Sequence, residues 1–263
     1  MTTETNFTQT PFQALVSGSF AGAMTPMTYQ GLYNIKVSKQ NTGKLPWDGK
    51  FMDHFVENFK KLNIGLSVNM AVQGSLFGIQ SGVNKAIVKQ LGGDSPTEKE
   101  KALSSIFTGI ITSPIENASE AVMIKKKIMT EEAEKKGHAK PTYRQVFWAM
   151  RPKSYVVGLP GMVFKTTGFT SAYIGLAPYW AKKINDKINN AFVSDLIGGA
   201  SAGALGCFAT QGFDTISTMP KVGKKIEWSP RALWKGGAIR AGYGALAVAA
   251  FTSINEMIKK IQK

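Results

Sequence analysis

Two distant parts of this chain carry the same glycine pattern, and this repetition strongly restricts what the chain can fold into. In each part, two glycines four residues apart precede a Gln-Gly step whose glycine lies nine residues further on. The two copies contain Gly18, Gly22 and Gly31, and Gly199, Gly203 and Gly212. Small residues at this spacing let two helices approach closely in a membrane. A related phrase over 113–119 lies between the copies, which indicates a chain built from internal repeats.

Six stretches with almost no charged residues alternate with strongly charged segments. They cover 5–35, 62–84, 102–115, 154–181, 196–213 and 241–255, and Lys165 interrupts the fourth. Each stretch is a candidate for a membrane-spanning helix, although buried helices of soluble proteins have a similar composition. The regular alternation of six such stretches predicts an all-α membrane protein with six transmembrane helices.

The basic residues are distributed unevenly between these stretches. The chain of 263 residues has a net charge of +15, and two thirds of its 32 lysines and arginines fall in 36–61, 125–153 and 221–240. Such a bias predicts that these segments lie on the inner side of the membrane and that both termini lie on the other side. The net charge is then explained by membrane orientation and anionic lipid head groups. No stripe of basic and aromatic residues is evident, so we expect no nucleic-acid partner.

The six stretches pair into three repeats within a single domain. The predicted repeats are 11–90, 98–187 and 192–263. Each is expected to be a helix pair joined by a basic loop. Amphipathic pieces are expected in the first two loops, over Asp48–Phe59 and Tyr143–Met150, whereas the third loop, Lys221–Pro230, is too short for more than a turn. The charged run Lys125–Lys140 is interpreted as a solvated extension of a helix.

The third repeat carries the clearest family signature. Leu233-Trp234-Lys235-Gly236 precedes its second helix, and Asn255-Glu256-Met257-Ile258-Lys259 ends it. With three pairs of spans and a turn motif at the end of each first helix, the chain resembles the mitochondrial carrier family. The resemblance implies a single carrier-like domain of six transmembrane helices in three pseudo-symmetric repeats. It also implies a location in the mitochondrial inner membrane, with both termini on the intermembrane-space side.

In that family, a motif at the end of each odd-numbered helix closes the matrix side through a ring of ion pairs. The positions that match its acids and bases are Tyr33, Glu116 and Asp214, and Lys36, Ser119 and Ser217. Only Asp214 and Lys36 are expected to form an ion pair. Glu116 is expected to face Ser217, and Tyr33 to face Ser119. Two of the three charge pairs of the family are therefore predicted to be missing.

The motif that closes the opposite side is also reduced. Its positions hold Gln80, Ser81 and Asn84 in the first repeat, Ala177, Pro178 and Ala181 in the second, and Asn255, Glu256 and Lys259 in the third. Only the third repeat keeps an acid and a base, and neither has a charged partner on the other helices. Alternating access requires two closed states of similar stability. The loss of gate charges therefore predicts impaired transport.

Two further candidate sites follow from the resemblance. The central substrate-contact positions correspond to Val68, Lys165 and Tyr243. A charge within a span is expensive, so Lys165 is the candidate contact for an anion, unless it snorkels, pairs with another subunit or is a relic. Trp234, Lys235 and Gly236 form the candidate lipid site, where a helix N-terminus and a lysine suit a phosphate of cardiolipin. The alternative is an ordinary interfacial anchor.

No arrangement of residues points to an enzyme or to a cofactor. The two histidines and the single cysteine are remote from plausible partners, and Cys207 is expected to be a buried thiol. The favoured function is a structural or accessory subunit of a large inner-membrane assembly, such as a respiratory complex. The alternative is an active carrier of a small anionic metabolite. A basic, helical RNA-binding protein would require all six uncharged stretches to be soluble core.

Overall fold

All the regular secondary structure of the described residues is helical. The computed structural model describes residues 9–42, 45, 51–63, 66–93 and 95–261, and these contain no strand. The longer helices are α1 (Pro11–Met24), α2 (Pro26–Thr42), α4 (Leu66–Gly92), α5 (Glu98–Lys135), α7 (Leu159–Thr170), α8 (Ala177–Ile188), α9 (Ala191–Ala209), α10 (Gln211–Lys221) and α12 (Gly237–Ile261). Shorter helices are η1 (Phe51–His54), α3 (Phe55–Leu62), α6 (Tyr143–Ala149), η2 (Pro152–Tyr155) and α11 (Pro230–Leu233), and a π-helical turn, η3 (Ser171–Leu176), joins α7 to α8.

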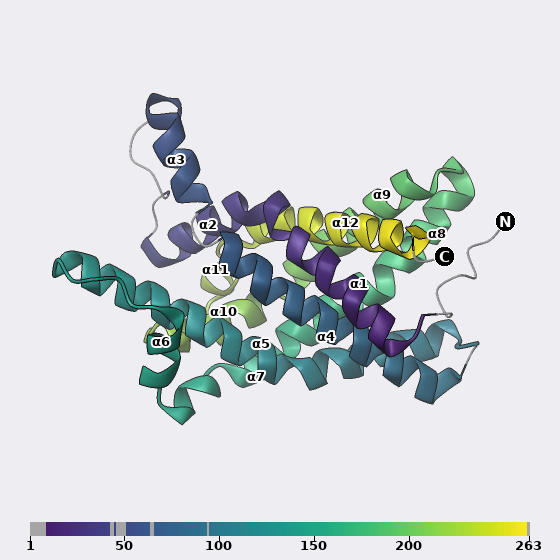
Figure 1. Cartoon of the computed structure of the whole chain (residues 1–263), viewed down its shortest axis with the longest axis horizontal. Coiled ribbons are helices and arrows are strands. Elements are labelled where there is room, and N and C mark those ends of the chain that lie inside the picture. The colour runs from purple at the N-terminus through teal and green to yellow at the C-terminus, as the bar shows by residue number, and fades with distance from the viewer. Residues whose placement is uncertain (1–8, 43–44, 46–50, 64–65, 94, 262–263) are drawn as a thin grey trace.

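The longer helices form a closed ring. Helix α1 packs on α4, α4 on α5, α5 on α7, α8 on α9 and α9 on α12, and α12 returns to contact both α1 and α2. The connecting helices α3 and α6 lie at one end of the bundle, and the start of α1 and the end of α12 lie toward the other (Figure 1). We refer to these as the connecting end and the terminal end.

The first two glycines of each copy of the repeated pattern lie at close helix contacts, as their spacing predicts. A Cβ atom on Gly22 would lie 2.6 Å from Cβ of Phe77 on α4, and Gly18 is equally close to Ser81 of that helix. In the third repeat, Gly199 and Gly203 approach the backbone of α12. Glycine at these positions therefore allows the two helices of each pair to touch along their backbones.

The first helical segments of the three repeats differ in whether they are continuous. The first is interrupted at Thr25, where Pro26 begins α2, and the third is interrupted at Thr210 between α9 and α10. Helix α5 instead runs continuously through Pro114. Since proline lacks the N–H needed for a helix hydrogen bond, Pro26 accounts for the interruption at Thr25. Gly31 and Gly212 lie inside continuous helices.

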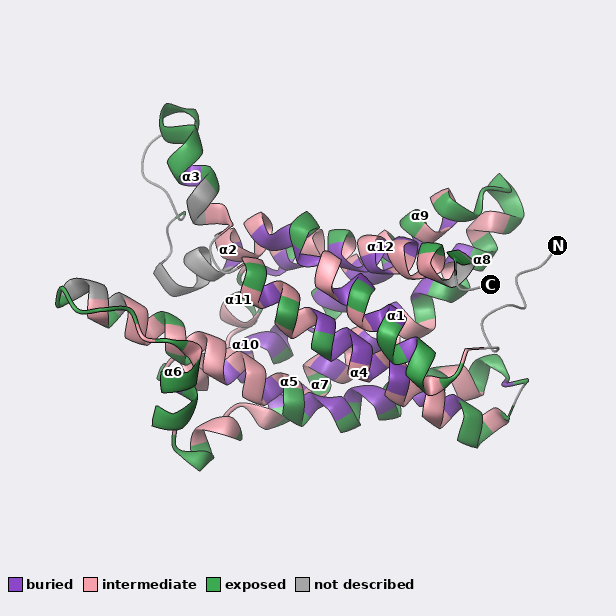
Figure 2. Ribbon diagram, viewed as in Figure 1, coloured by how far each residue is buried: buried purple, intermediate pink, exposed green. Residues whose placement is uncertain are grey.

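Burial is inverted relative to a soluble bundle, most clearly on α5. The buried side chains in its first half are polar: Ser104, Ser105, Thr108, Thr112, Ser113 and Asn117. The exposed large side chains on the same stretch are apolar: Leu103, Ile106, Phe107, Ile110, Ile111 and Ile115. Figure 2 shows buried residues concentrated toward the bundle interior, with exposed residues on its outer faces and ends. Soluble monomers rarely expose so much contiguous apolar surface.

Several local predictions can be compared with the structure. Helix α5 extends through most of the charged run to Lys135, the amphipathic pieces form η1, α3 and α6, and Asp48 lies outside the described residues. The third loop, Lys221–Pro230, runs from the end of α10 to the first residue of α11 and holds no helix between them, as its length predicts. Cys207 is a buried free thiol, as expected. By length and composition, two helical stretches within the described residues could cross a membrane, Ala191–Ala209 and Pro230–Ile258, against the six predicted from the sequence.

Candidate functional site

Seven charged side chains meet inside the connecting end of the ring. They come from five different helices and are here called the charge cluster. Its members are Lys36 on α2, Glu116 and Glu120 on α5, Lys165 on α7, Asp214 and Lys221 on α10, and Arg240 on α12. All are buried or partly buried. The cluster therefore joins segments that are far apart in the sequence.

Asp214 pairs with more cations than either of the other two carboxylates of the charge cluster. Its Oδ2 lies 2.5 Å from Nζ of Lys36, and its Oδ1 lies 3.4 Å from Nζ of Lys165 and 3.8 Å from Nε of Arg240. The guanidinium of Arg240 also donates to the hydroxyl of Thr210 at 2.9 Å. One carboxylate thus holds cations from three helices, which offsets part of their desolvation.

Lys165 is surrounded by carboxylates from two neighbouring helices. Its Nζ lies 3.1 Å from Glu120, 3.5 Å from Glu116 and 3.4 Å from Asp214. Glu120 is also bound by Lys221 at 3.2 Å. Lys165 therefore connects α5 to α10, because it pairs with carboxylates on both helices.

The ion pair predicted from the sequence, Lys36 with Asp214, is present, and among the described residues no other ion pair joins two of the six motif positions. The further ion pairs of the cluster involve residues outside those positions. Glu116 accepts a hydrogen bond from Thr166 at 2.9 Å, and Ser217 accepts one from Lys221 at 2.9 Å. These contacts take the place of the expected pairing between Glu116 and Ser217. The additional charges come from Glu120 and Lys221, each one helical turn beyond a motif position, and from Lys165 on α7 and Arg240 on α12.

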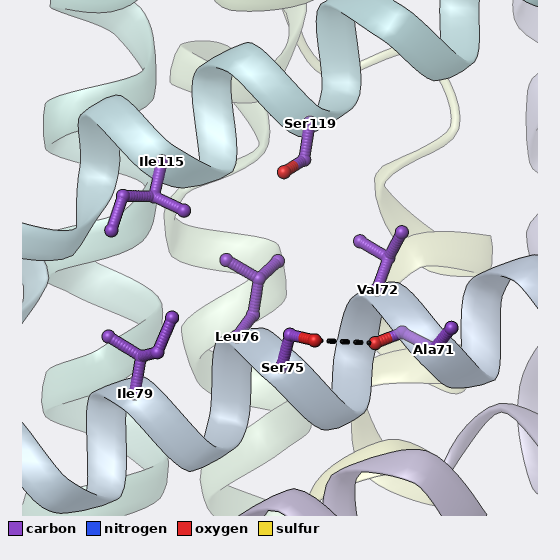
Figure 3. Close-up of a pocket in the computed structure, with 7 residues that line it drawn as sticks. All are labelled: Ala71, Val72, Ser75, Leu76, Ile79, Ile115 and Ser119. Carbon is purple, nitrogen blue, oxygen red and sulfur yellow. Dashed lines mark hydrogen bonds between the residues drawn. The ribbon is translucent and has the colours of Figure 1, made fainter. Parts of the chain in front are cut away.

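The expected pairing of Tyr33 with Ser119 is not among the contacts of the described residues. The Tyr33 ring instead packs edge-on against Tyr243, with centroids 6.0 Å apart. Ser119 lines a groove of about 250 Å³ between α4 and α5, with Val72, Leu76 and Ile115 (Figure 3). Among the described residues, no ion pair joins α2 to α5, whereas ion pairs join each of these helices to α10.

Of the three central contact candidates, only Lys165 is part of the charge cluster. Tyr243 stacks on Tyr29, with centroids 5.6 Å apart, and Lys36 lies 5.9 Å from the centre of the Tyr243 ring. Val68 lies half-buried on α4. An aromatic layer thus borders the cluster on one side.

A second constriction lies nearer the terminal end. The rings of Phe77, Tyr173 and Phe251 contact one another, with centroid separations of 4.6 to 5.4 Å. We call these three residues the aromatic triad. The hydroxyl of Tyr173 donates to Oε1 of Gln80 at 2.7 Å, and Gln80 Nε2 donates to Thr112 at 3.3 Å. All three rings are buried, so the interior is filled at this level.

The remaining opposite-gate candidates form no shared cluster within the described residues. Asn84 accepts hydrogen bonds from Ser104 and Thr108 of α5, at 2.8 and 3.4 Å. Oδ1 of Asn255 is buried without a hydrogen-bond partner. Ser81 packs against Gly18, Glu256 is half-buried on α12, and the side chain of Lys259 lies outside the described residues.

The candidate lipid site lies at the start of α12. Trp234 and Lys235 are exposed, and Gly236 adopts a positive φ of 87° that favours glycine. The carbonyl of Lys235 accepts a hydrogen bond from Gln211 at 3.1 Å, which fixes the loop against α10. A rigid loop with an exposed indole and lysine thus precedes the helix N-terminus.

The sequence analysis missed Glu120, Lys221 and Arg240. Glu120 follows Glu116 by four residues, and Lys221 follows Ser217 by four, so both lie one helical turn beyond a motif position. That spacing is the signal that could have found them. Arg240 lies on an even-numbered helix, outside any of the motif positions considered.

No protein-family model matches this chain, and no curated protein matches it either.

Proposed function

We propose that this chain is a divergent carrier-like membrane protein that does not transport efficiently and serves as an accessory subunit of a larger membrane assembly. The observation that carries the proposal is the engagement of Lys165. This lysine is the charged residue among the central contact candidates, and three carboxylates lie within 3.5 Å of it. A substrate anion would have to displace those carboxylates, which are already paired with the same cation.

A membrane location is supported by the inverted burial of the helices. The outer face of α5 carries Ile106, Phe107 and Ile110, whereas its inner face carries Thr108 and Thr112. Hydrocarbon chains can cover the first set, and polar partners inside the ring satisfy the second. The six-helix ring would then correspond to six spans, with the basic connecting end on the inner side of the membrane.

The mitochondrial inner membrane is the location that the family resemblance implies. In that membrane, Trp234, Lys235 and Gly236 would bind a phosphate of cardiolipin, because an exposed indole, a lysine and a helix N-terminus meet there. Other subunits of an inner-membrane assembly, such as a respiratory complex, would cover part of the apolar outer surface.

An active carrier of a small anionic metabolite is the second candidate. It is favoured by the charge balance of the cluster, which contains four cations and three carboxylates. One positive charge is therefore left over in the interior, where a small anion would neutralise it.

The experiment that separates the two functions is the native size of the protein after mild solubilisation of its membranes. Co-migration in fixed stoichiometry with a large assembly is expected for an accessory subunit. Migration as a free monomer, together with anion uptake by proteoliposomes that Lys165→Ala abolishes, would favour the carrier instead. Release of the protein by alkaline carbonate would contradict both, because neither allows a soluble protein.

A further inference from the structure

The aromatic triad joins three helices that are not neighbours in the ring. Phe77 lies on α4, Tyr173 on η3 and Phe251 on α12. Helix α1 lies between α4 and α12, α5 between α4 and η3, and α9 between η3 and α12. Since the three rings nevertheless touch, they meet across the interior of the bundle and not along its wall.

The triad and the charge cluster lie at different depths. Tyr173 follows Lys165 by eight residues, and Phe251 follows Arg240 by eleven, in helices that run from the connecting end to the terminal end. At 1.5 Å per residue, the triad lies about 12 to 17 Å further along these helices than the cluster. The interior therefore has two successive closures of different chemistry.

Each ring of the triad is buried and is held by contacts beyond the other two rings. Phe77 contacts both other rings, and its Cβ atom lies against Gly22 of α1. The Tyr173 hydroxyl is fixed by Gln80 at 2.7 Å. Ala21, Ala177, Ala202 and Val248 surround the rings as part of one buried apolar cluster. A constriction of this kind excludes hydrated ions, because the ring faces and the surrounding aliphatic side chains cannot replace their water and the Tyr173 hydroxyl is already bound to Gln80.

We propose that the aromatic triad is a hydrophobic seal that isolates the charge cluster from solvent at the terminal end. The seal acts in series with the cluster, so that either closure alone keeps the interior impermeable to small ions. This inference rests on the proposed function in one respect, namely that the ring spans a membrane.

The test is a two-by-two comparison of ion leakage in vesicles of phosphatidylcholine and cardiolipin. The four proteins are the wild type, Phe77→Ala/Phe251→Ala, Lys36→Ala/Lys165→Ala, and the combination of all four substitutions. Chloride efflux is measured with an entrapped chloride-sensitive dye. Phe20→Ala is the matched control, because Phe20 is an exposed ring on α1. Each protein is first checked for membrane insertion and helix content.

The wild type, the control and both variants that lose only one closure are expected to leak no faster than protein-free vesicles. The combined variant is expected to leak at least tenfold faster, because both closures are then removed. Equal leakage from Lys36→Ala/Lys165→Ala and the combined variant would overturn the proposal, and so would a well-inserted combined variant that stays impermeable.

Smaller substitutions keep the test informative if the combined variant does not fold. Phe251→Ala with Lys165→Ala removes one member of each closure, and the same order of leakage rates is expected. Failure of the wild-type protein to insert would contradict the membrane assignment itself. Anion exchange by the wild-type protein would contradict the proposed function. The seal would still be tested, because leakage is compared between variants with and without the aromatic side chains.

Discussion

Replacing Asp214 by asparagine is expected to destabilise the protein more than any other single change in the charge cluster. The substitution removes the carboxylate that lies within 4 Å of Lys36, Lys165 and Arg240. Removing one partner of a buried ion pair costs about 3 to 5 kcal/mol, because the remaining charge stays buried. Lys36 would lose the carboxylate with which it pairs among the described residues.

The effect can be measured by thermal unfolding of the purified protein in detergent. With about 2 to 4 °C of midpoint shift per kcal/mol for a chain of this size, Asp214→Asn should lower the midpoint by roughly 10 °C. Lys36→Ala should cost less, since Asp214 keeps Lys165 and Arg240 as partners. Glu98→Gln is the matched control, because it breaks an exposed ion pair with Lys101 worth about 0 to 1 kcal/mol.

The double reversal Lys36→Asp/Asp214→Lys tests whether Asp214 is shared. An isolated pair would regain its stability when both charges are exchanged. A lysine at position 214 would instead face Lys165 and Arg240, so we expect little recovery. Full recovery, or a loss for Asp214→Asn no greater than for Glu98→Gln, would refute the shared carboxylate.

Three other predictions concern packing and burial. Gly203→Ala should lower the free energy of unfolding by about 1 to 3 kcal/mol, because a Cβ atom there would meet the carbonyl of Gly244. Gly31→Ala should be tolerated, because the nearest atom to its new Cβ is 3.9 Å away. Tyr173→Phe should cost about 1 kcal/mol, because Gln80 loses a buried donor; both effects are measured by unfolding in detergent. Cys207 should react with maleimide only under denaturing conditions, because its thiol is buried, and rapid labelling of the folded protein would contradict the packing of α9 on α12.

The sequence was most informative where small residues and charge patterns repeat. The glycine spacing predicted the tight contacts of Gly22 and Gly203, since only glycine permits such backbone approach. The charged run after Ile124 was correctly read as a helix extension, because lysine and glutamate favour exposed helix. The motif alignment also located Lys36 and Asp214, which meet across 178 residues of sequence.

The other contacts of the charge cluster, and the aromatic triad, depend on how side chains from different helices meet in the interior of the bundle. Lys165 was assigned to a central anion contact, but its length lets it reach Glu116 and Glu120 on the neighbouring helix. The aromatic triad has no sequence motif, because its three rings converge only when the ring of helices closes. Positions in a motif predict which residue types face the interior, and not which partner each one finds.

The closure of the ring by α12 has a consequence for how the protein is made. Helix α12 completes the contacts of α1 and α2, and Asp214 pairs with a lysine that precedes it by most of the chain. Helices α1 and α2 therefore emerge from the ribosome long before α12 exists, although α4, which covers the glycine face of α1, follows soon after them. During that interval, Lys36 and the side of α1 that packs on α12 remain without their final partners. A nonsense mutation after α10 would remove α12 and leave α1 and α2 without the helix that closes the ring. Complete folding therefore requires the last helix of the described chain.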